Sequence, residues 1–290
     1  MYRQVRRATA VAGAALMVSF LLLYGDVLLK LFRDWATDDN YSHGFVVAPL
    51  AVYFAWQRRS ALAATPMRPS RWGLALVGFS LVMLLAGTLG AELFVARTSL
   101  LVLIAGAILY LFGPTHLRLL AFPVAFLALM IPLPAIIFNQ IALPLQLFAS
   151  RVGALALTTA GVPVLREGNV IVLANTTLEV AEACSGIRSL VSLVTLAIVL
   201  GQFAASANWV RLLLAVTAVP VAIAANAARV AGTGLAAHYF GPAAAEGFLH
   251  TFSGWLVFLL ALSLLVAMLR LLDAIRSRTH VGETRAAAAS

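Results

Sequence analysis

Long apolar runs separated by short polar segments fill this 290-residue chain from end to end. A helix needs about 20 apolar residues to cross the hydrocarbon core of a bilayer, and several runs approach or reach that length. Only 11% of the residues are charged and 62% are hydrophobic, which leaves too few polar residues to cover a water-soluble domain. We therefore predict an all-α polytopic membrane protein.

The runs predict about eight transmembrane helices joined by short loops. We expect these helices at about residues 8–32, 44–56, 72–90, 98–112, 117–137, 187–204, 212–230 and 251–269. The first run is too long for the apolar region of a signal peptide, and no small-residue cleavage site closes it. Polar residues and Pro144 interrupt residues 139–162, which indicates an interfacial or re-entrant helix in that segment.

Residues 163–182 differ from the rest of the chain. β-branched residues alternate there with polar ones around an Ala-Asn-Thr-Thr turn, which predicts a small β-hairpin outside the membrane. We expect residues 1–280 to form a single integral membrane domain that includes this hairpin. Residues 281–290 are expected to be a disordered cytoplasmic tail.

The distribution of charge predicts the topology. If the N-terminus is cytoplasmic and eight spans alternate, the C-terminus is cytoplasmic too. The cytoplasmic side then carries thirteen of the twenty basic residues and two of the eleven acidic ones. This is the positive-inside pattern, so topology explains the net charge of +9 and no nucleic acid is needed as a partner.

The segment EACSGIRSL, residues 182–190, places the only cysteine, Cys184, just before a span. Ser185 and Gly186 suit the start of a helix, whose dipole lowers the pKa of a thiol at its N-terminus. Arg188 follows one helical turn later and would lower the thiol pKa further. The pattern indicates a nucleophilic thiolate, although a free cysteine is more often a small buried apolar residue.

A second candidate group, Asn226 and Arg229, lies at the expected outer end of a span. The two residues are three apart and share a helical face. Ionisable residues in or near the bilayer are costly and are usually functional. Arg229 could bind an oxyanion or a carboxylate, and the alternative is an interfacial arginine whose head reaches water.

His250 begins the last span on the same expected side of the membrane as Cys184. A histidine beside a cysteine can act as general base and then as general acid. The alternative is a hydrogen-bonded interfacial histidine. His238 also lies on this side, but its aromatic neighbours Tyr239 and Phe240 indicate an interfacial role.

The segment DDNYSHGF, residues 38–45, supplies two aspartates and His43. With one histidine it is a weak metal-site pattern, and a loop that caps a site or contacts substrate fits it better. Glu182 is a candidate to orient Arg188 or the histidine. The chain has no phosphate-binding loop, no His-Glu-x-x-His helix and no Gly-x-Ser-x-Gly elbow. A transporter is disfavoured because the spans lack buried acidic residues.

Six segments, taken together and in order, resemble the exosortase family. They are YSHGF (41–45), IPLP (131–134), GVPVLREGNVI (161–171), LEVAEACSGIRSL (178–190), NAARVAGTGLAAHYFG (226–241) and EGFLHTFSGW (246–255). The resemblance implies a bacterial inner-membrane cysteine protease or transpeptidase with its active site at the periplasmic face. The resemblance also implies an active site made of a Cys, an Arg and a His, which correspond to Cys184, Arg229 and His250.

The resemblance also implies the substrates. These are exported proteins with a C-terminal PEP-CTERM tail, made of a Pro-Glu-Pro-like motif, a hydrophobic helix and a basic end. Cleavage would pass through a thioester that an unknown amine acceptor or water resolves, and exopolysaccharide production would be linked to it. Arg188, Glu182, Asn226 and His43 are then expected to bind or orient substrate, and no cofactor or metal is implied.

A different class of function stays open on the sequence. The chain could be a non-enzymatic membrane component of an exopolysaccharide assembly or export system, with Cys184 serving only in packing. A membrane-impermeant thiol reagent would separate the two, since an active thiolate at the outer face reacts near neutral pH and a buried packing cysteine resists.

Overall fold

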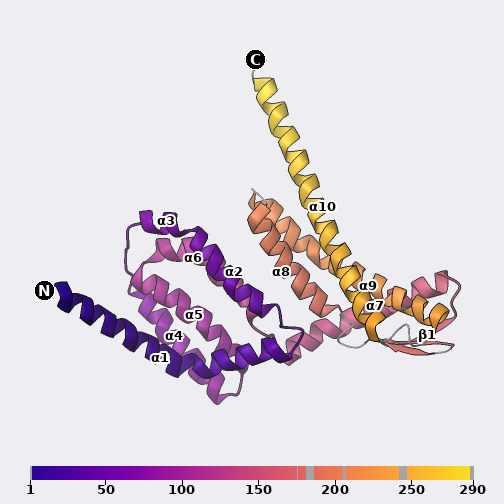
Figure 1. The fold of residues 1–290 in the computed structure, drawn as a ribbon, viewed down its shortest axis with the longest axis horizontal. Coiled ribbons are helices and arrows are strands. Elements are labelled where there is room, and N and C mark those ends of the chain that lie inside the picture. Colours follow the sequence, from indigo (N-terminus) through magenta and orange to yellow (C-terminus); the bar gives the residue numbers. More distant parts are fainter. Residues whose placement is uncertain (1, 175, 181–185, 205–206, 242–246, 288–290) are drawn as a thin grey trace. The chain divides into compact units, whose positions relative to one another are not determined.

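The computed structural model describes residues 2–174, 176–180, 186–204, 207–241 and 247–287 (Figure 1). The chain divides into two compact units, Met1–Pro134 and Ala135–Ser290, called here the N-terminal and C-terminal units. Both consist mainly of helices, and the C-terminal unit also holds one small sheet. The predicted all-α polytopic membrane fold with a small β insertion is confirmed.

The N-terminal unit is helical throughout. Its elements are α1 (Tyr2–Thr37), α2 (Gly44–Gln57), α3 (Arg59–Ala64), α4 (Trp72–Leu89), α5 (Leu93–Leu111), α6 (Pro114–Phe126) and the 3-10 helix η1 (Leu127–Met130). α4 and α5 form a closely packed antiparallel pair. A Cβ atom at Gly73 would collide with the backbone of Tyr110, and one at Gly87 with the backbone of Ala96. Small residues allow this approach, as they commonly do between membrane helices.

Polar contacts attach α1 to the rest of this unit. The hydroxyl of Tyr24 lies 3.1 Å from Ser99 Oγ on α5, and both side chains are fully buried. Arg97 Nη2 donates to Asp34 Oδ2 at 2.5 Å. These contacts satisfy polar groups inside an apolar helix bundle, where an unsatisfied group is costly.

The last turns of α1 and the loop that follows it each contact η1 at one point. Trp35 Nε1 donates to the carbonyl oxygen of Met130 over 2.9 Å. His43 Nε2 donates to the carbonyl oxygen of Leu129 over the same distance. Burial lowers the pKa of His43 below its ordinary value of 6.5, and the bond to Leu129 opposes this in part. His43 therefore stabilises the N-terminal unit, whatever further role it has.

This burial predicts a pH dependence of stability. The folded state disfavours the protonated ring of His43, so the unfolded chain binds more protons at acidic pH. The free energy of unfolding therefore begins to fall as the pH drops below about 6.5, and it falls until the pH reaches the lower pKa of the folded state. His43→Gln keeps a donor for Leu129 but cannot titrate. We expect its thermal unfolding midpoint in detergent to change less between about pH 7.5 and 5.5 than that of the unaltered chain. Equal changes would contradict this.

The C-terminal unit contains the helices and the sheet that surround the predicted site. Its elements are α7 (Ala135–Thr159), β1 (Val164–Glu167), β2 (Val170–Leu173), β3 (Thr177–Glu179), α8 (Ile187–Ala204), α9 (Asn208–Phe240) and α10 (Gly247–Ala287). α9 packs against α7, α8 and α10. α10 continues as a helix through most of the segment expected to be a disordered tail.

The sheet has the order β1-β2-β3, and both pairs are antiparallel. The predicted hairpin is present as β2 and β3, with Ile171 opposite Leu178. The sequence reasoning missed β1, which pairs with β2 across a turn at Gly168, where φ is +63°. A Gly-Asn pair between two apolar strands is a known signal for such a turn, so this strand could have been found from the sequence.

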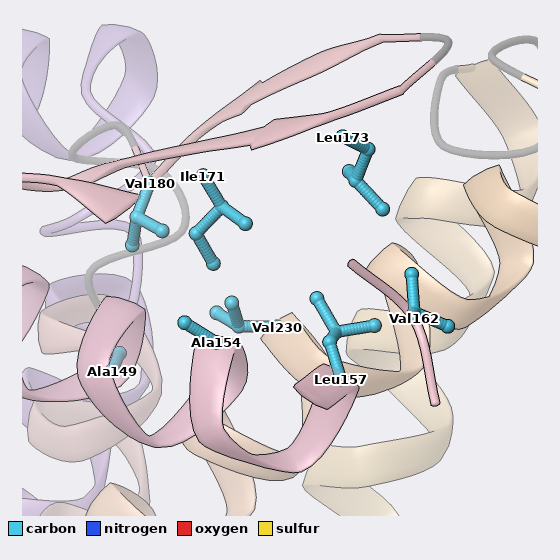
Figure 2. Packing of buried hydrophobic residues seen from close by; sticks show 8 residues of the cluster. All are labelled: Ala149, Ala154, Leu157, Val162, Ile171, Leu173, Val180 and Val230. Carbon is cyan, nitrogen blue, oxygen red and sulfur yellow. The ribbon is translucent and has the colours of Figure 1, made fainter. Parts of the chain in front are cut away.

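One face of the sheet packs on the helices. Ile171 and Leu173 are buried and point from the sheet toward α7, where Leu157 is fully buried (Figure 2). Val230 extends the same cluster to α9. A separate cluster of Leu193, Ala197, Ala218, Ala222, Ala261 and Leu265 joins α8, α9 and α10. α9 therefore connects the sheet to the helices that carry the predicted site.

Seven helices in the described part of the chain are long and apolar enough to cross a membrane. They cover Gly13–Thr37, Trp72–Leu89, Leu93–Leu111, Ala135–Thr159, Ile187–Ala204, Asn208–Phe240 and Gly254–Ile275. The expected spans at 44–56 and 117–137 are shorter apolar helices, Gly44–Gln57 and Pro114–Met130. The second of these ends where Pro132 and Pro134 disfavour helix at the residues before them.

The segment expected to form an interfacial or re-entrant helix, residues 139–162, belongs largely to α7. α7 is one continuous 25-residue helix, and Pro144 lies inside it. Of the polar residues that interrupt the apolar run, Gln146 is buried, whereas Asn139, Gln140 and Arg151 are exposed. Ser150 is buried as well. Ser150 Oγ lies 2.9 Å from the carbonyl oxygen of Gly168, to which it donates.

Candidate active site

The start of α8 touches α9 at Asn226. Gly186 precedes α8 and has a φ of +79°, a backbone conformation that favours glycine. A Cβ atom at Gly186 would lie 2.6 Å from Asn226 Cγ, closer than real Cβ contacts. Asn226 is 5% exposed. The chain segment two residues after Cys184 is thus held against the face of α9 that carries Asn226.

Arg229 lies one helical turn after Asn226 and touches α10. Its side chain is half-buried. A Cβ atom at Gly254 would lie 3.1 Å from Arg229 Cζ, so the guanidinium packs against the backbone of α10. The three-residue spacing of Asn226 and Arg229 puts both on one face of α9. This face therefore contacts α8 through one residue and α10 through the other.

A small pocket lies where the three helices meet. Its polar lining comes from Ser189 on α8 and from Asn226 and Arg229 on α9, and Gly254 contributes from α10. The space holds roughly one water molecule. A peptide cannot enter so small a space, so a substrate would have to meet these residues from the surface.

The structure places the sequence-predicted residues unevenly. Cys184 and Glu182 lie outside the described residues. His250 belongs to α10, one helical turn before Gly254, and its side chain also lies outside the described part. Arg188 is half-buried in the first turn of α8. His43 belongs to the N-terminal unit.

The described backbone brings together three segments that are distant in sequence. They are the start of α8 from Gly186, the Asn226–Arg229 turn of α9, and the turn of α10 that ends at Gly254. The first segment begins two residues after Cys184 in the sequence, the second carries Arg229, and the third carries His250. Among the residues described, no group of three His, Cys, Asp or Glu side chains could hold a metal ion.

The sequence reasoning missed the contact roles of Gly254 and Ser189. A glycine inside an apolar helix often marks a close approach, so Gly254 carried a usable signal. Ser189 had no such sequence signal, because serines are common in membrane helices. Its neighbours are known only from the fold. Gly186 had been interpreted only as part of a helix start, and its contact with Asn226 comes from the structure.

We expect Gly186→Ala to destabilise the C-terminal unit by about 2–4 kcal/mol. The cost combines the strain of a positive φ with the collision against Asn226. Gly161→Ala is the matched control, because Gly161 has a φ of +82° and open space around it. It should cost about 1 kcal/mol, the strain alone. Denaturant unfolding in detergent measures both, and equal losses would show that the Asn226 contact is unimportant.

Comparison with known proteins identifies a family. A family model described as transmembrane exosortase matches residues 35–267, which is most of the chain. The matched range includes Cys184, Arg229 and His250 as well as the three segments that meet at the small pocket. No curated protein and no solved structure matches the chain.

Proposed function

The chain belongs to the transmembrane exosortase family, and from this premise we propose that it is a cysteine protease or transpeptidase of the bacterial inner membrane. Its substrates are exported proteins that end in a PEP-CTERM tail, and its reaction serves exopolysaccharide and biofilm matrix production. One observation supports the proposal of a site. Gly186, two residues after Cys184, contacts Asn226, and Gly254, four residues after His250, contacts Arg229, where α8, α9 and α10 pack together.

Cys184 is the nucleophile in this proposal. It precedes α8, whose N-terminus carries the positive end of the helix dipole. Arg188 in the first turn of α8 adds a positive charge at the same end of this helix. Both favour the thiolate, which is the reactive form of cysteine.

Arg229 and His250 complete the proposed chemistry. Arg229 stabilises the oxyanion that forms on the scissile carbonyl, or it binds the glutamate of the substrate motif. His250 is the acid and base. Gly254 supports this pairing, because it touches the guanidinium of Arg229 and follows His250 by one helical turn. Arg188, Glu182, Asn226 and His43 are proposed to bind or orient the substrate.

The reaction then has two steps. The thiolate of Cys184 attacks the scissile carbonyl carbon, the peptide C–N bond breaks, and protonated His250 gives a proton to the leaving amine. The product is a thioester on Cys184. An amine acceptor or water next attacks this thioester, passes a proton to His250, and releases the thiolate.

The proposed topology follows from the charge pattern over eight alternating spans, of which α7 is not one. The N- and C-termini are cytoplasmic and the site lies at the periplasmic face, where exported substrates arrive. Their apolar tail helix would lie in the bilayer beside the protein, which places the motif at the membrane surface.

A reporter experiment tests the function. A tagged exported protein with a PEP-CTERM tail from the same genome is expressed with and without this protein and followed by blot. We expect the tail to be removed only when the protein is present. No processing would instead favour a non-enzymatic component of an exopolysaccharide system, and Cys184 should then resist a membrane-impermeant thiol reagent in intact membranes.

A further inference from the structure

A cavity of about 340 Å³ lies in the N-terminal unit, between α1 and the turn that joins α4 to α5. This volume lies in the range of small-ligand sites. The charged part of its lining consists of Asp26 and Lys30 from α1 and Arg97 from α5, and the rest is mostly apolar. We propose that this cavity binds the headgroup of a membrane phospholipid, with the phosphodiester on Lys30 and Arg97.

Arg97 has donor capacity beyond its known partner. It is 4% exposed, and its Nη2 donates to Asp34. Its Nε has no hydrogen-bond partner among the residues that the structure describes. A guanidinium has five N–H donors, and its planar shape suits phosphate oxygens. Keeping such a cation buried in an apolar bundle is costly, so a second anionic partner would stabilise it.

Lys30 supplies the second cation at the same cavity. Its Nζ lies 2.8 Å from Asp26 Oδ2, one helical turn away on α1. Its side chain is 47% exposed, so the ammonium can turn toward a ligand without breaking a buried contact. The first turn of α5 also lines the cavity through Leu93 and Ala96, and the carboxylate of Glu92 already caps that helix end by accepting from the Phe94 amide.

The depth of the cavity points to a lipid. α4 has 18 residues and is roughly 27 Å long at 1.5 Å per residue, close to the thickness of the hydrocarbon core. If α4 crosses the hydrocarbon core, its last turn, which lines the cavity with Gly87 and Thr88, would lie near the level of the lipid phosphates. α1, α4 and α5 are all candidate spans, so acyl chains surround this site.

The charge balance favours a phosphodiester over free phosphate. Asp26 and Asp34 are close to the two cations. A dianionic phosphate would be repelled by these carboxylates more strongly than a singly charged diester. The mostly apolar lining can also contact the glycerol and first acyl carbons of a lipid, whereas free phosphate has no apolar group to contact it.

Native mass spectrometry of the full chain in detergent tests the proposal. The probe is a short-chain phosphatidylglycerol, and we expect one tightly bound molecule. Lys30→Gln should weaken binding by about tenfold, the loss of one charge-assisted hydrogen bond. Arg97→Lys keeps the charge beside Asp34 but loses the planar fork, and should also weaken binding.

Two control variants isolate the cation. Asp26→Asn breaks the same ion pair as Lys30→Gln but keeps the ammonium, so it should bind at least as tightly as the unaltered chain. Arg33→Gln removes an exposed cation of α1 that does not line the cavity, and should change nothing. The proposal is wrong if diacylglycerol binds as well as the phospholipid, if inorganic phosphate displaces the lipid, or if Lys30→Gln behaves like Arg33→Gln. None of these readouts depends on protease activity.

Discussion

Replacing Cys184 with alanine is expected to abolish removal of the PEP-CTERM tail from the co-expressed reporter. Loss of the nucleophile removes the covalent step altogether, and losses of this kind reach about 10³-fold or more. On a blot, the reporter should stay at full length while the unaltered protein processes it. The variant is expected to fold, since cysteine and alanine are both small and apolar.

Two companion measurements make the Cys184 result specific. A thermal unfolding midpoint within a few degrees of the unaltered protein shows that the loss is chemical and not structural. Cys184→Ser should leave little activity, because a hydroxyl ionises far less readily than a thiol near neutral pH. Full processing by Cys184→Ala would disprove the nucleophile assignment and, with it, the thioester mechanism.

Arg229→Gln is expected to lower kcat/KM for tail removal by about 10²–10³-fold. That is the usual cost of removing one donor that stabilises an oxyanion. Arg229→Lys should recover part of this loss, because it keeps the charge but not the planar geometry. Initial rates at several substrate concentrations measure the effect. A fall in kcat indicates oxyanion stabilisation, whereas a rise in KM alone indicates binding of the substrate carboxylate.

The contact between Arg229 and α10 provides a control that leaves the arginine in place. A methyl group at Gly254 would lie 3.1 Å from Cζ and 3.2 Å from one terminal nitrogen, so the guanidinium must shift. Gly254→Ala should therefore slow processing by about tenfold, since small displacements of a catalytic group are costly. On α9, the new methyl group of Gly232→Ala meets open space, so this variant should process the reporter at the unaltered rate.

An unchanged rate in Arg229→Gln would show that Arg229 takes no part in the reaction.

Some differences between the predicted and the observed elements have local sequence signals. The expected span at 117–137 includes Pro132 and Pro134, and the residues before both prolines disfavour helix, so the end at Met130 was predictable. The turn at Gly168 was also a readable signal for β1. Both signals are local, because they depend on the backbone preferences of adjacent residues.

Other differences could not have been predicted. Gln146 and Ser150 interrupt an apolar run, and nothing in their spacing reveals that both are buried inside the unit. The bond between His43 and the Leu129 carbonyl joins residues 86 positions apart. Contacts over such separations depend on how the helices pack, and local sequence carries no record of them.

By itself, the sequence determined the membrane class and most of the helices, because hydrophobic length and helical spacing are properties of short segments. The three-residue spacing also predicted that Asn226 and Arg229 share one face of a helix. Only the tertiary structure decided what that face meets. Gly186 touches Asn226, and Gly254 touches Arg229. Glycine leaves room for such a close approach. Which residue lies opposite each glycine depends on how α8, α9 and α10 pack.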